Sequence, residues 1–272
     1  MCGSQEWAEH LQTDVLPVVT AGIDLGADML EIGPGPGAAT GWLAERVTRL
    51  TALESDEAAA AALAKRFPDV TVAVGDAARM SYPDESFDSV GSFTMLHHVP
   101  TTAQQNQILA EVLRVLRPGG RFVFAGEPTS VGNGYARTLS TLTWRITTNV
   151  TKLPGLGSWR RPQAELDESS RAAALEVVVD LHTFTPSDLE KMAVSAGAVD
   201  VETATVEFTA AMLGWPLRTF EYAVPSERLG WVWAKLAFNS WKTLSWVDEN
   251  LCRRVVPKGW FYNVMITGIK PS

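Results

Sequence analysis

The sequence predicts an α/β fold with a doubly wound, parallel sheet, to which helical insertions are added. Between residues 28 and 125, five short apolar runs alternate with segments of helical pattern, as expected for parallel strands covered by helices. The first apolar run leads into a cluster of glycines, which indicates a tight turn between strand and helix. Eight of the ten tryptophans follow residue 143, so the second half of the chain has a different chemistry from the first.

The expected elements follow in a regular order up to residue 127. Apolar runs bounded by Gly, Pro or Asp predict strands over residues 28–32, 50–54, 70–74, 87–93 and 121–125. Composition and helical spacing predict helices over residues 4–20, 38–47, 57–67 and 102–116. Beyond a long mixed segment, the chain is expected to form a helix over residues 185–195 and strands over residues 199–208 and 260–269.

These patterns divide the chain into a core and two insertions. The core is expected to comprise residues 25–127, 183–208 and 260–272, preceded by an N-terminal helix within residues 1–24. The insertions are residues 128–182 and the tryptophan-rich residues 209–259, which are expected to form a helical cap.

Composition excludes several classes of protein. With 46% apolar and 20% charged residues among 272, the chain is expected to be folded, and its net charge of −8 argues against a general nucleic-acid binder. Cys2 and Cys252 allow neither a disulfide framework nor a cysteine zinc site, and no His, Asp and Glu cluster has metal-ligand spacing, so no metal is predicted. Because no signal-peptide pattern and no membrane-inserting run is present, we expect a cytoplasmic protein.

The glycine cluster has the spacing of a nucleotide-binding turn. Gly33, Gly35 and Gly37 stand between a strand and a helix, where glycine permits positive φ and close approach of a ligand to the backbone. Glu54 ends the next strand, where a carboxylate accepts hydrogen bonds from the two hydroxyls of a ribose. Asp56 lies two residues later and is an alternative for that role.

Five segments, in order along the chain, resemble the motifs of class I S-adenosylmethionine-dependent methyltransferases of the type 11 kind. They are Leu30–Gly37, Ala52–Glu54, Val74–Ala77, Ser86–Val99 and Glu111–Gly120. The resemblance covers residues 25–127 and implies a Rossmann-like sheet, mostly parallel, with an antiparallel last strand. It also implies a small-molecule methyltransferase that uses S-adenosylmethionine as its cofactor, with the N-terminal helix over the cofactor site.

The resemblance assigns cofactor binding to nine residues: Glu31, Gly33, Gly35, Gly37, Glu54, Asp76, Ala77, Ser92 and Phe93. The glycines would pack under the methionyl part of the cofactor, and Glu31 would orient its ammonium group. Glu54 would bind the ribose hydroxyls, and Asp76 would accept a hydrogen bond from the adenine amino group beside the Ala77 backbone. The end of the fourth strand, around Ser92, would face the sulfonium.

Candidates for a catalytic base, or for positioning the substrate, are few. Methyl transfer to a carboxylate or phenolate needs no base, whereas transfer to an alcohol does. His97 and His98 follow the fourth strand, Glu127 ends the fifth, and His182 precedes the helix after the first insertion. For each of them a purely structural role is the competing interpretation.

The second insertion is basic and aromatic. Residues 210–260 contain seven Lys and Arg against four Asp and Glu, on an acidic chain. Apolar residues at helical spacing between Leu229 and Leu251 predict one long helix. The turn-forming residues 214–216 and 257–259 lie on either side of it, and we expect them to act as hinges if this insertion opens and closes as a cap. A packed core helix, a cap over the active site and a membrane-surface helix all remain open. The candidate substrate contacts are Trp231, Phe238 and Trp241.

The leading interpretation is transfer of a methyl group to an oxygen, in a carboxylate or hydroxyl, of an apolar small molecule such as a lipid acid, phenol or polyketide-like metabolite. The alternatives are an NAD-dependent oxidoreductase on the same glycine turn and a non-catalytic protein that binds the cofactor or a lipid. Asp76 after the third strand argues against the first alternative, and the intact set Glu31, Glu54 and Asp76 argues against the second.

Overall fold

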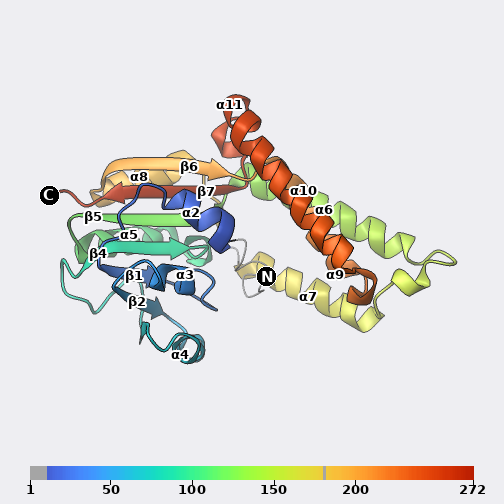
Figure 1. Ribbon diagram of the computed structural model, residues 1–272, viewed down its shortest axis with the longest axis horizontal. Coiled ribbons are helices and arrows are strands. Elements are labelled where there is room, and N and C mark those ends of the chain that lie inside the picture. The colour runs from blue at the N-terminus through green and yellow to red at the C-terminus, as the bar shows by residue number, and fades with distance from the viewer. Residues whose placement is uncertain (1–10, 180–181) are drawn as a thin grey trace. The chain divides into compact units, whose positions relative to one another are not determined.

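A computed structural model of the protein describes residues 11–179 and 182–272 (Figure 1). The chain forms two compact units, each made of segments that are distant in sequence. The first unit comprises the described residues up to Glu127 together with Pro186–Ala204 and Met265–Ser272, and the second comprises Pro128–Thr185 and Thr205–Val264.

The seven strands form one sheet in the order β3-β2-β1-β4-β5-β7-β6. They are β1 (Asp28–Ile32), β2 (Arg49–Glu54), β3 (Thr71–Val74), β4 (Phe87–Phe93), β5 (Leu116–Pro128), β6 (Val199–Val206) and β7 (Asn263–Ile269). The pairs β1–β2, β1–β4, β2–β3 and β4–β5 are parallel. Backbone hydrogen bonds between Lys270 and both Gly119 and Gly120 join the end of the chain to β5, and Figure 1 shows β7 running against β5. The predicted fold class is confirmed.

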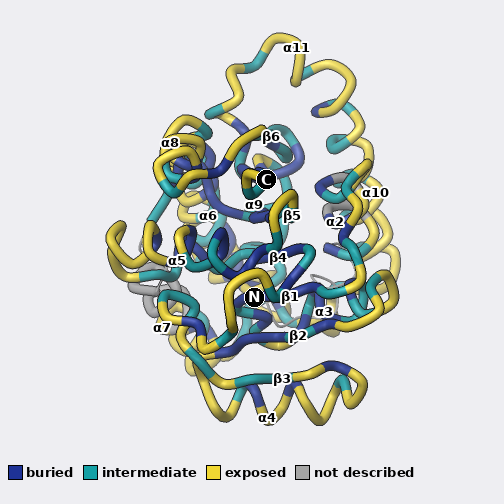
Figure 2. The backbone as a smooth tube through the Cα atoms, turned by 90° about the vertical axis from the view of Figure 1, so that its left-hand side faces the viewer, coloured by how far each residue is buried: buried dark blue, intermediate teal, exposed yellow. Residues whose placement is uncertain are grey.

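The direction of winding reverses between β1 and β4, which places the carboxyl ends of these strands at the switch point where α/β sheets bind ligands. Both strands are buried along most of their length (Figure 2). Even polar residues of these strands, such as Glu31, Ser89 and Ser92, are buried, because a parallel strand covered on both faces has no solvent-exposed side.

The helices of the first unit are α2 (Leu16–Val19), α3 (Thr40–Ala44), α4 (Glu57–Arg66), α5 (Thr102–Val115) and α8 (Pro186–Ala196). Among them, α4 and α5 begin at side-chain caps. The Asp56 carboxylate accepts a hydrogen bond from the Ala59 N–H at the start of α4, and the Thr101 hydroxyl accepts one from the Gln104 N–H at the start of α5. Asp56 is therefore engaged as a helix cap through its Oδ1.

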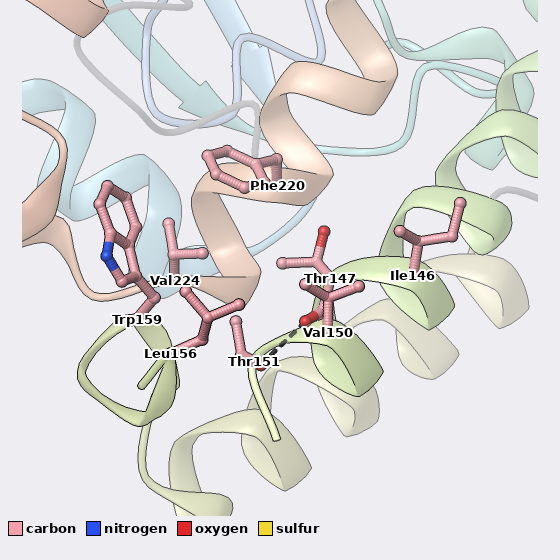
Figure 3. A pocket seen from close by; sticks show the side chains of 8 residues that line it. All are labelled: Ile146, Thr147, Val150, Thr151, Leu156, Trp159, Phe220 and Val224. Carbon is pink, nitrogen blue, oxygen red and sulfur yellow. Dashed lines mark hydrogen bonds between the residues drawn. The ribbon is translucent and has the colours of Figure 1, made fainter. Parts of the chain in front are cut away.

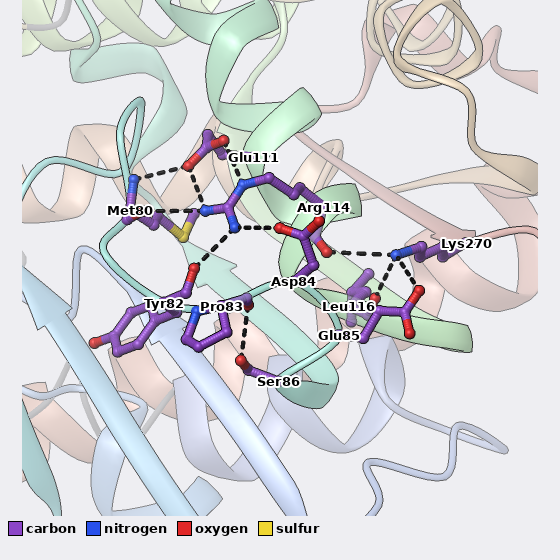
Figure 4. A network of polar contacts seen from close by, with 10 residues as sticks. All are labelled: Met80, Tyr82, Pro83, Asp84, Glu85, Ser86, Glu111, Arg114, Leu116 and Lys270. Atoms are coloured by element: carbon purple, nitrogen blue, oxygen red, sulfur yellow. Dashed lines mark hydrogen bonds and ion pairs between the residues drawn. The ribbon is translucent and has the colours of Figure 1, made fainter.

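The segment that precedes β5 anchors a loop through one arginine (Figure 4). The Arg114 guanidinium donates to both Glu111 oxygens, to Asp84 and to the carbonyl oxygens of Met80 and Tyr82. Glu111 also accepts a hydrogen bond from the Met80 N–H. The segment Glu111–Gly120 thus has a structural role, since its first residues fix the loop between β3 and β4.

The second unit is helical. Its helices are α6 (Ser130–Val150), α7 (Gln163–Val179), α9 (Thr209–Ala223), α10 (Trp231–Val247) and the short α11 (Arg253–Val255). Helix α9 packs against both α6 and α10 (Figure 1). Buried Asp248 follows α10 and accepts hydrogen bonds from the N–H groups of residues 208, 209 and 210, so it caps the start of α9.

Several predicted elements require correction. Residues 4–10 of the predicted N-terminal helix lie outside the described residues, and the predicted helix over residues 38–47 is reduced to α3. Strand β5 begins five residues before the predicted position, and β7 begins at Asn263 because residues 258–260 form a 3₁₀ turn.

The predicted turn at residues 214–216 is wrong, since it lies inside α9. Packing on α6 and α10 maintains the helix although Pro216 cannot donate a backbone hydrogen bond. The segment 127–182, predicted only as mixed, contains α6 and α7. Its threonines are accommodated in α6 because hydroxyls such as those of Thr138 and Thr148 donate to the carbonyl oxygen four residues earlier.

Candidate functional site

The turn between β1 and α3 is left-handed at its three glycines, with φ of 63° at Gly33, 51° at Gly35 and 82° at Gly37. Their surroundings differ. A β-carbon at Gly33 would overlap the Met95 side chain, and one at Gly37 would lie 2.5 Å from Phe67. At Gly35 the same β-carbon would meet no atom within 4 Å. Packing therefore accounts for two of the glycines, whereas Gly35 borders open space in which a ligand could approach the backbone.

Alanine at these positions should separate stability from ligand binding. We expect Gly33→Ala to lower the free energy of unfolding by about 2–3 kcal/mol, because it adds a steric overlap to the cost of a left-handed backbone. Gly35→Ala should cost about 1 kcal/mol of stability but weaken binding at the turn. Chemical denaturation and calorimetric titration with S-adenosylhomocysteine measure the two effects. If the two variants lost affinity for S-adenosylhomocysteine in the same proportion to their loss of stability, the separate roles of Gly33 and Gly35 would be contradicted.

Glu54 lies at the end of β2 and reaches the glycine turn. Its Oε2 accepts a hydrogen bond of 3.0 Å from the Gly35 N–H, and its Oε1 accepts bonds from the N–H groups of Ser55 and Asp56. The side chain is almost completely buried. The carboxylate is therefore oriented before any ligand arrives, at the one glycine of the turn that borders open space.

Glu31 lies in β1, where it is 1% exposed. Its Oε2 accepts a hydrogen bond of 2.7 Å from the Thr40 hydroxyl at the start of α3. Burial raises the pKa of Glu31 to about 7, since the bond from Thr40 opposes this rise only in part and the nearby Glu54 charge adds to it. At neutral pH this carboxyl is poised between its two protonation states.

The other expected cofactor contacts lie at the ends of β3 and β4. Asp76 is exposed and its Oδ1 accepts a hydrogen bond from the Ala78 N–H, which fixes the turn that contains the half-buried Ala77. Ser92 and Phe93 are buried at the end of β4, with Ser92 opposite Ile32 of β1. Among the described residues, the Ser92 hydroxyl has no hydrogen-bond partner. It is therefore a buried, unsatisfied polar group beside the switch point.

Glu127 is fully buried at the end of β5 and holds the short 3₁₀ turn Leu96–His98 in place. Its Oε1 accepts hydrogen bonds from the N–H groups of Met95 and Leu96, and its Oε2 accepts one from the His97 N–H. The His97 Nδ1 lies 2.7 Å from the same Oε2. Because both oxygens are engaged, the geometry favours a role for Glu127 in holding this turn over the two predicted roles, as a base or in positioning the substrate.

The two other candidate histidines, His98 and His182, lie in different units. The ring of His98 lies 4.0 Å from that of His97, centroid to centroid, and His98 is half-buried in the first unit. His182 is half-buried in the second unit. Among the described residues, no group of three or more His, Cys, Asp and Glu could hold a metal ion.

The predicted substrate residues lie on α10. Trp231 and Phe238 are exposed, and the Phe238 ring stacks at 6.4 Å on that of Trp241, which faces α9 at Gly214. An apolar pocket of about 260 Å³ lies elsewhere in the second unit (Figure 3) and is lined by Ile146, Thr147, Val150, Thr151, Leu156, Trp159, Phe220 and Val224. This pocket was not expected from the sequence, because no helix was predicted over α6, whose apolar positions 146 and 150 are separated by one helical turn.

Comparison with known proteins supports the family resemblance for the first unit. Residues 30–124 match the family model described as a methyltransferase domain, and the chain carries such a domain there. A probable S-adenosylmethionine-dependent methyltransferase of Mycolicibacterium smegmatis is 38% identical over 98 residues, which are 36% of this chain and 37% of that protein. The phthiotriol/phenolphthiotriol dimycocerosates methyltransferase of Mycobacterium tuberculosis is 35% identical over 108 residues, covering 38% and 39%. The chain thus spans well under half the length of these relatives.

Solved structures resemble the chain over most of its length. Phosphoethanolamine N-methyltransferase 2 of Haemonchus contortus, in complex with S-adenosyl-L-methionine, has a TM-score of 0.55 at 15% identity over 97% of this chain and 53% of that one. A putative methyltransferase of Bacillus halodurans has a TM-score of 0.50 at 17% identity over 94% and 97%. At these identities the likeness establishes the fold alone.

Proposed function

We propose that this chain, with its methyltransferase domain at residues 30–124, is an S-adenosylmethionine-dependent enzyme that methylates an oxygen of an apolar small molecule. The observation that carries the proposal is the hydrogen bond from the Gly35 N–H to Glu54. A carboxylate at the end of β2 is expected to bind a ribose, and this bond places it beside Gly35, where the glycine turn borders open space. The relatives described above are methyltransferases by name, which supports methyl transfer as the reaction.

The residues present fit the cofactor. Gly35 provides open space over the backbone, Glu54 provides an oriented carboxylate, and Ser92 provides a buried hydroxyl with no hydrogen-bond partner among the described residues. Glu54 would hold the ribose hydroxyls and Asp76 the adenine amino group, while Glu31 would face the ammonium group. When bound, the cofactor supplies a methyl group on a positively charged sulfur.

The chain's own contribution to the reaction is orientation and exclusion of water. Holding an acceptor oxygen in line with the transferred methyl group supplies about 7–11 kcal/mol of barrier reduction in well-oriented systems. A carboxylate or phenolate acceptor would need no proton transfer, and an alcohol would need a base within hydrogen-bond reach. His97, whose Nδ1 contacts Glu127, and the adjacent His98 are both candidates for that base.

The acceptor is proposed to be apolar, such as a lipid acid, a phenol or a polyketide-like metabolite. The motifs of the first unit are occupied with cofactor roles, so acceptor specificity is expected to come from residues 127–182 and 209–259. The apolar pocket of the second unit supports an apolar ligand. Among the relatives, one is named for the methylation of phthiotriol and phenolphthiotriol dimycocerosates.

A binding and turnover experiment tests this function. S-adenosylhomocysteine and NAD are titrated separately into the purified protein, and we expect binding of the first only. A labelled methyl donor is then supplied with panels of phenols, carboxylic acids and hydroxylated lipids, of which at least one should become labelled. Binding of NAD in place of S-adenosylhomocysteine would overturn the proposal in favour of an oxidoreductase.

Binding of the cofactor product should release a proton from Glu31. At about pH 6 this carboxyl holds its proton, because its pKa is raised to about 7. An ammonium group placed nearby favours the ionised form and lowers the pKa, so the proton leaves on binding. Calorimetric titrations of S-adenosylhomocysteine in two buffers of different ionisation enthalpy should give different heats, and Glu31→Gln should remove the difference. Equal heats for the unmodified protein would contradict the contact.

A further inference from the structure

The outer face of α10 presents large apolar side chains to solvent. Trp231 is 74% exposed and Trp246 is 61% exposed, and Val232, Leu236 and Phe238 between them are also exposed. Helical geometry places these positions on one broad side of a helix of 17 residues, about 25 Å long. Such a continuous exposed apolar surface marks an interaction site.

The opposite side of α10 packs on α9. The Trp233 Nε1 donates a hydrogen bond of 2.8 Å to Glu221 of α9, and the Phe220 and Trp233 rings lie 5.1 Å apart. Trp241 also faces α9, at Gly214. The inner face alone is thus sufficient to dock α10, so core packing does not explain the tryptophans of the outer face.

The charges on this face have a single sign. Residues 231–247 include Lys235 and Lys242 but no Asp or Glu. The Lys235 ammonium lies 5.8 Å from the Trp231 ring and the Lys242 ammonium 5.6 Å from the Phe238 ring, so both stems run along the aromatic surface. The second unit as a whole carries thirteen Lys and Arg against ten Asp and Glu, whereas the first unit carries ten against twenty-one.

We propose that the outer face of α10 docks the protein on the surface of an anionic lipid bilayer. Tryptophans at both ends of a helix, with lysines between them and no acidic residue, match the layered chemistry of a bilayer surface, where rings enter the acyl boundary and ammonium groups meet phosphates. The binding is peripheral. None of the described helices combines the length and apolarity needed to cross a bilayer.

The same charges argue against a second copy of the chain as the occupant. A symmetric contact between two α10 outer faces would bring Lys235 and Lys242 of each copy together without acidic partners. A protein partner is also less suited, because lysine is depleted in the buried centres of protein interfaces. An anionic bilayer satisfies the apolar rings and the lysines at once.

Vesicle flotation tests the proposal without reference to methyl transfer. The purified protein is mixed with vesicles of phosphatidylcholine alone or of equal parts phosphatidylcholine and phosphatidylglycerol. We expect binding to the anionic vesicles, weakened by salt. Lys235→Gln/Lys242→Gln should weaken it about twenty- to thirtyfold, which corresponds to ~1 kcal/mol for each basic residue at a membrane surface.

Two further variants test whether the outer face of α10 is the part that binds the vesicles. Trp231→Ser/Trp246→Ser should lower vesicle binding at least tenfold and leave the far-ultraviolet circular dichroism unchanged, because both side chains are largely exposed. The control Lys65→Gln/Lys191→Gln makes the same change of charge at exposed sites of α4 and α8 and should bind vesicles as the unmodified protein does. Absence of vesicle binding, equal losses in the control, or a concentration-dependent dimer that the tryptophan variant abolishes would each overturn the proposal.

Discussion

Replacing Glu127 with alanine is expected to lower the free energy of unfolding by about 3–5 kcal/mol, the cost of removing one member of a buried, hydrogen-bonded pair. The substitution leaves the N–H groups of Met95, Leu96 and His97 without their acceptor, and each buried donor left unsatisfied costs about 1–3 kcal/mol. It also removes the contact of the His97 Nδ1 with Oε2 of Glu127. Chemical denaturation followed by circular dichroism measures the loss.

The matched control is Glu85→Ala, which removes an exposed carboxylate 3.6 Å from the Lys270 ammonium. An exposed pair of this kind contributes about 1 kcal/mol or less. If the two variants lost the same stability, the buried contacts of Glu127 would not have the role that we assign to them.

Glu127 should also make the stability of the fold depend on pH. Burial would by itself raise the pKa of Glu127, but the His97 charge and the hydrogen bonds from His97 and from the backbone outweigh it, so the pKa lies below its usual value of 4.5. A lowered pKa contributes stability that is present above pH 4.5 and is lost as the pH falls through the folded-state value. The unmodified protein should therefore lose more stability on acidification than Glu127→Gln does.

Replacing Glu54 with alanine is expected to weaken the binding of S-adenosylhomocysteine by about ten- to a hundredfold. Hydrogen bonds to a charged group are worth about 1.5–3 kcal/mol, and the ribose hydroxyls would lose their acceptor. The variant also frees the Gly35 N–H, so the turn loses the contact that fixes its open position. Calorimetric titration gives the affinity.

Asp56→Ala is the matched control, since it removes a carboxylate two residues away. It should lower stability by about 1 kcal/mol through the loss of the α4 cap, and it should leave the affinity for S-adenosylhomocysteine unchanged. Asp76→Ala should weaken binding to a similar extent as Glu54→Ala, because it removes the acceptor for the adenine amino group. Unchanged affinity in folded Glu54→Ala and Asp76→Ala variants would contradict the site.

The fold of the first unit was largely predictable because its signals are local. Strand β4 was predicted with its observed ends, since it runs between two phenylalanines and is flanked by polar, turn-forming residues, so the information lies in the sequence itself. The error at residues 214–216 is the opposite case. Proline and glycine indicate a turn by local preference, but packing of α9 on two neighbouring helices decides the structure there.

The site was predictable where its residues belong to one motif. The glycine turn and Glu54 were placed by spacing, and the structure adds that Gly35 alone borders open space. The pair of Glu127 and His97 was predicted as two separate candidates, because residues that are 30 positions apart meet only through the pairing of β4 and β5. Sequence could not show that Glu127 has both oxygens engaged by one short turn.

The division of the second unit into two chain segments has a consequence for how the protein folds during synthesis. Helix α6 emerges from the ribosome well before α9, the helix against which it packs, and β6 of the core is made in between. At synthesis rates of about 5–20 residues per second, the apolar side of α6 waits several seconds for its partner. Such a delay exposes a nascent chain to aggregation, so the second unit is the part of the molecule whose folding should depend most on chaperones.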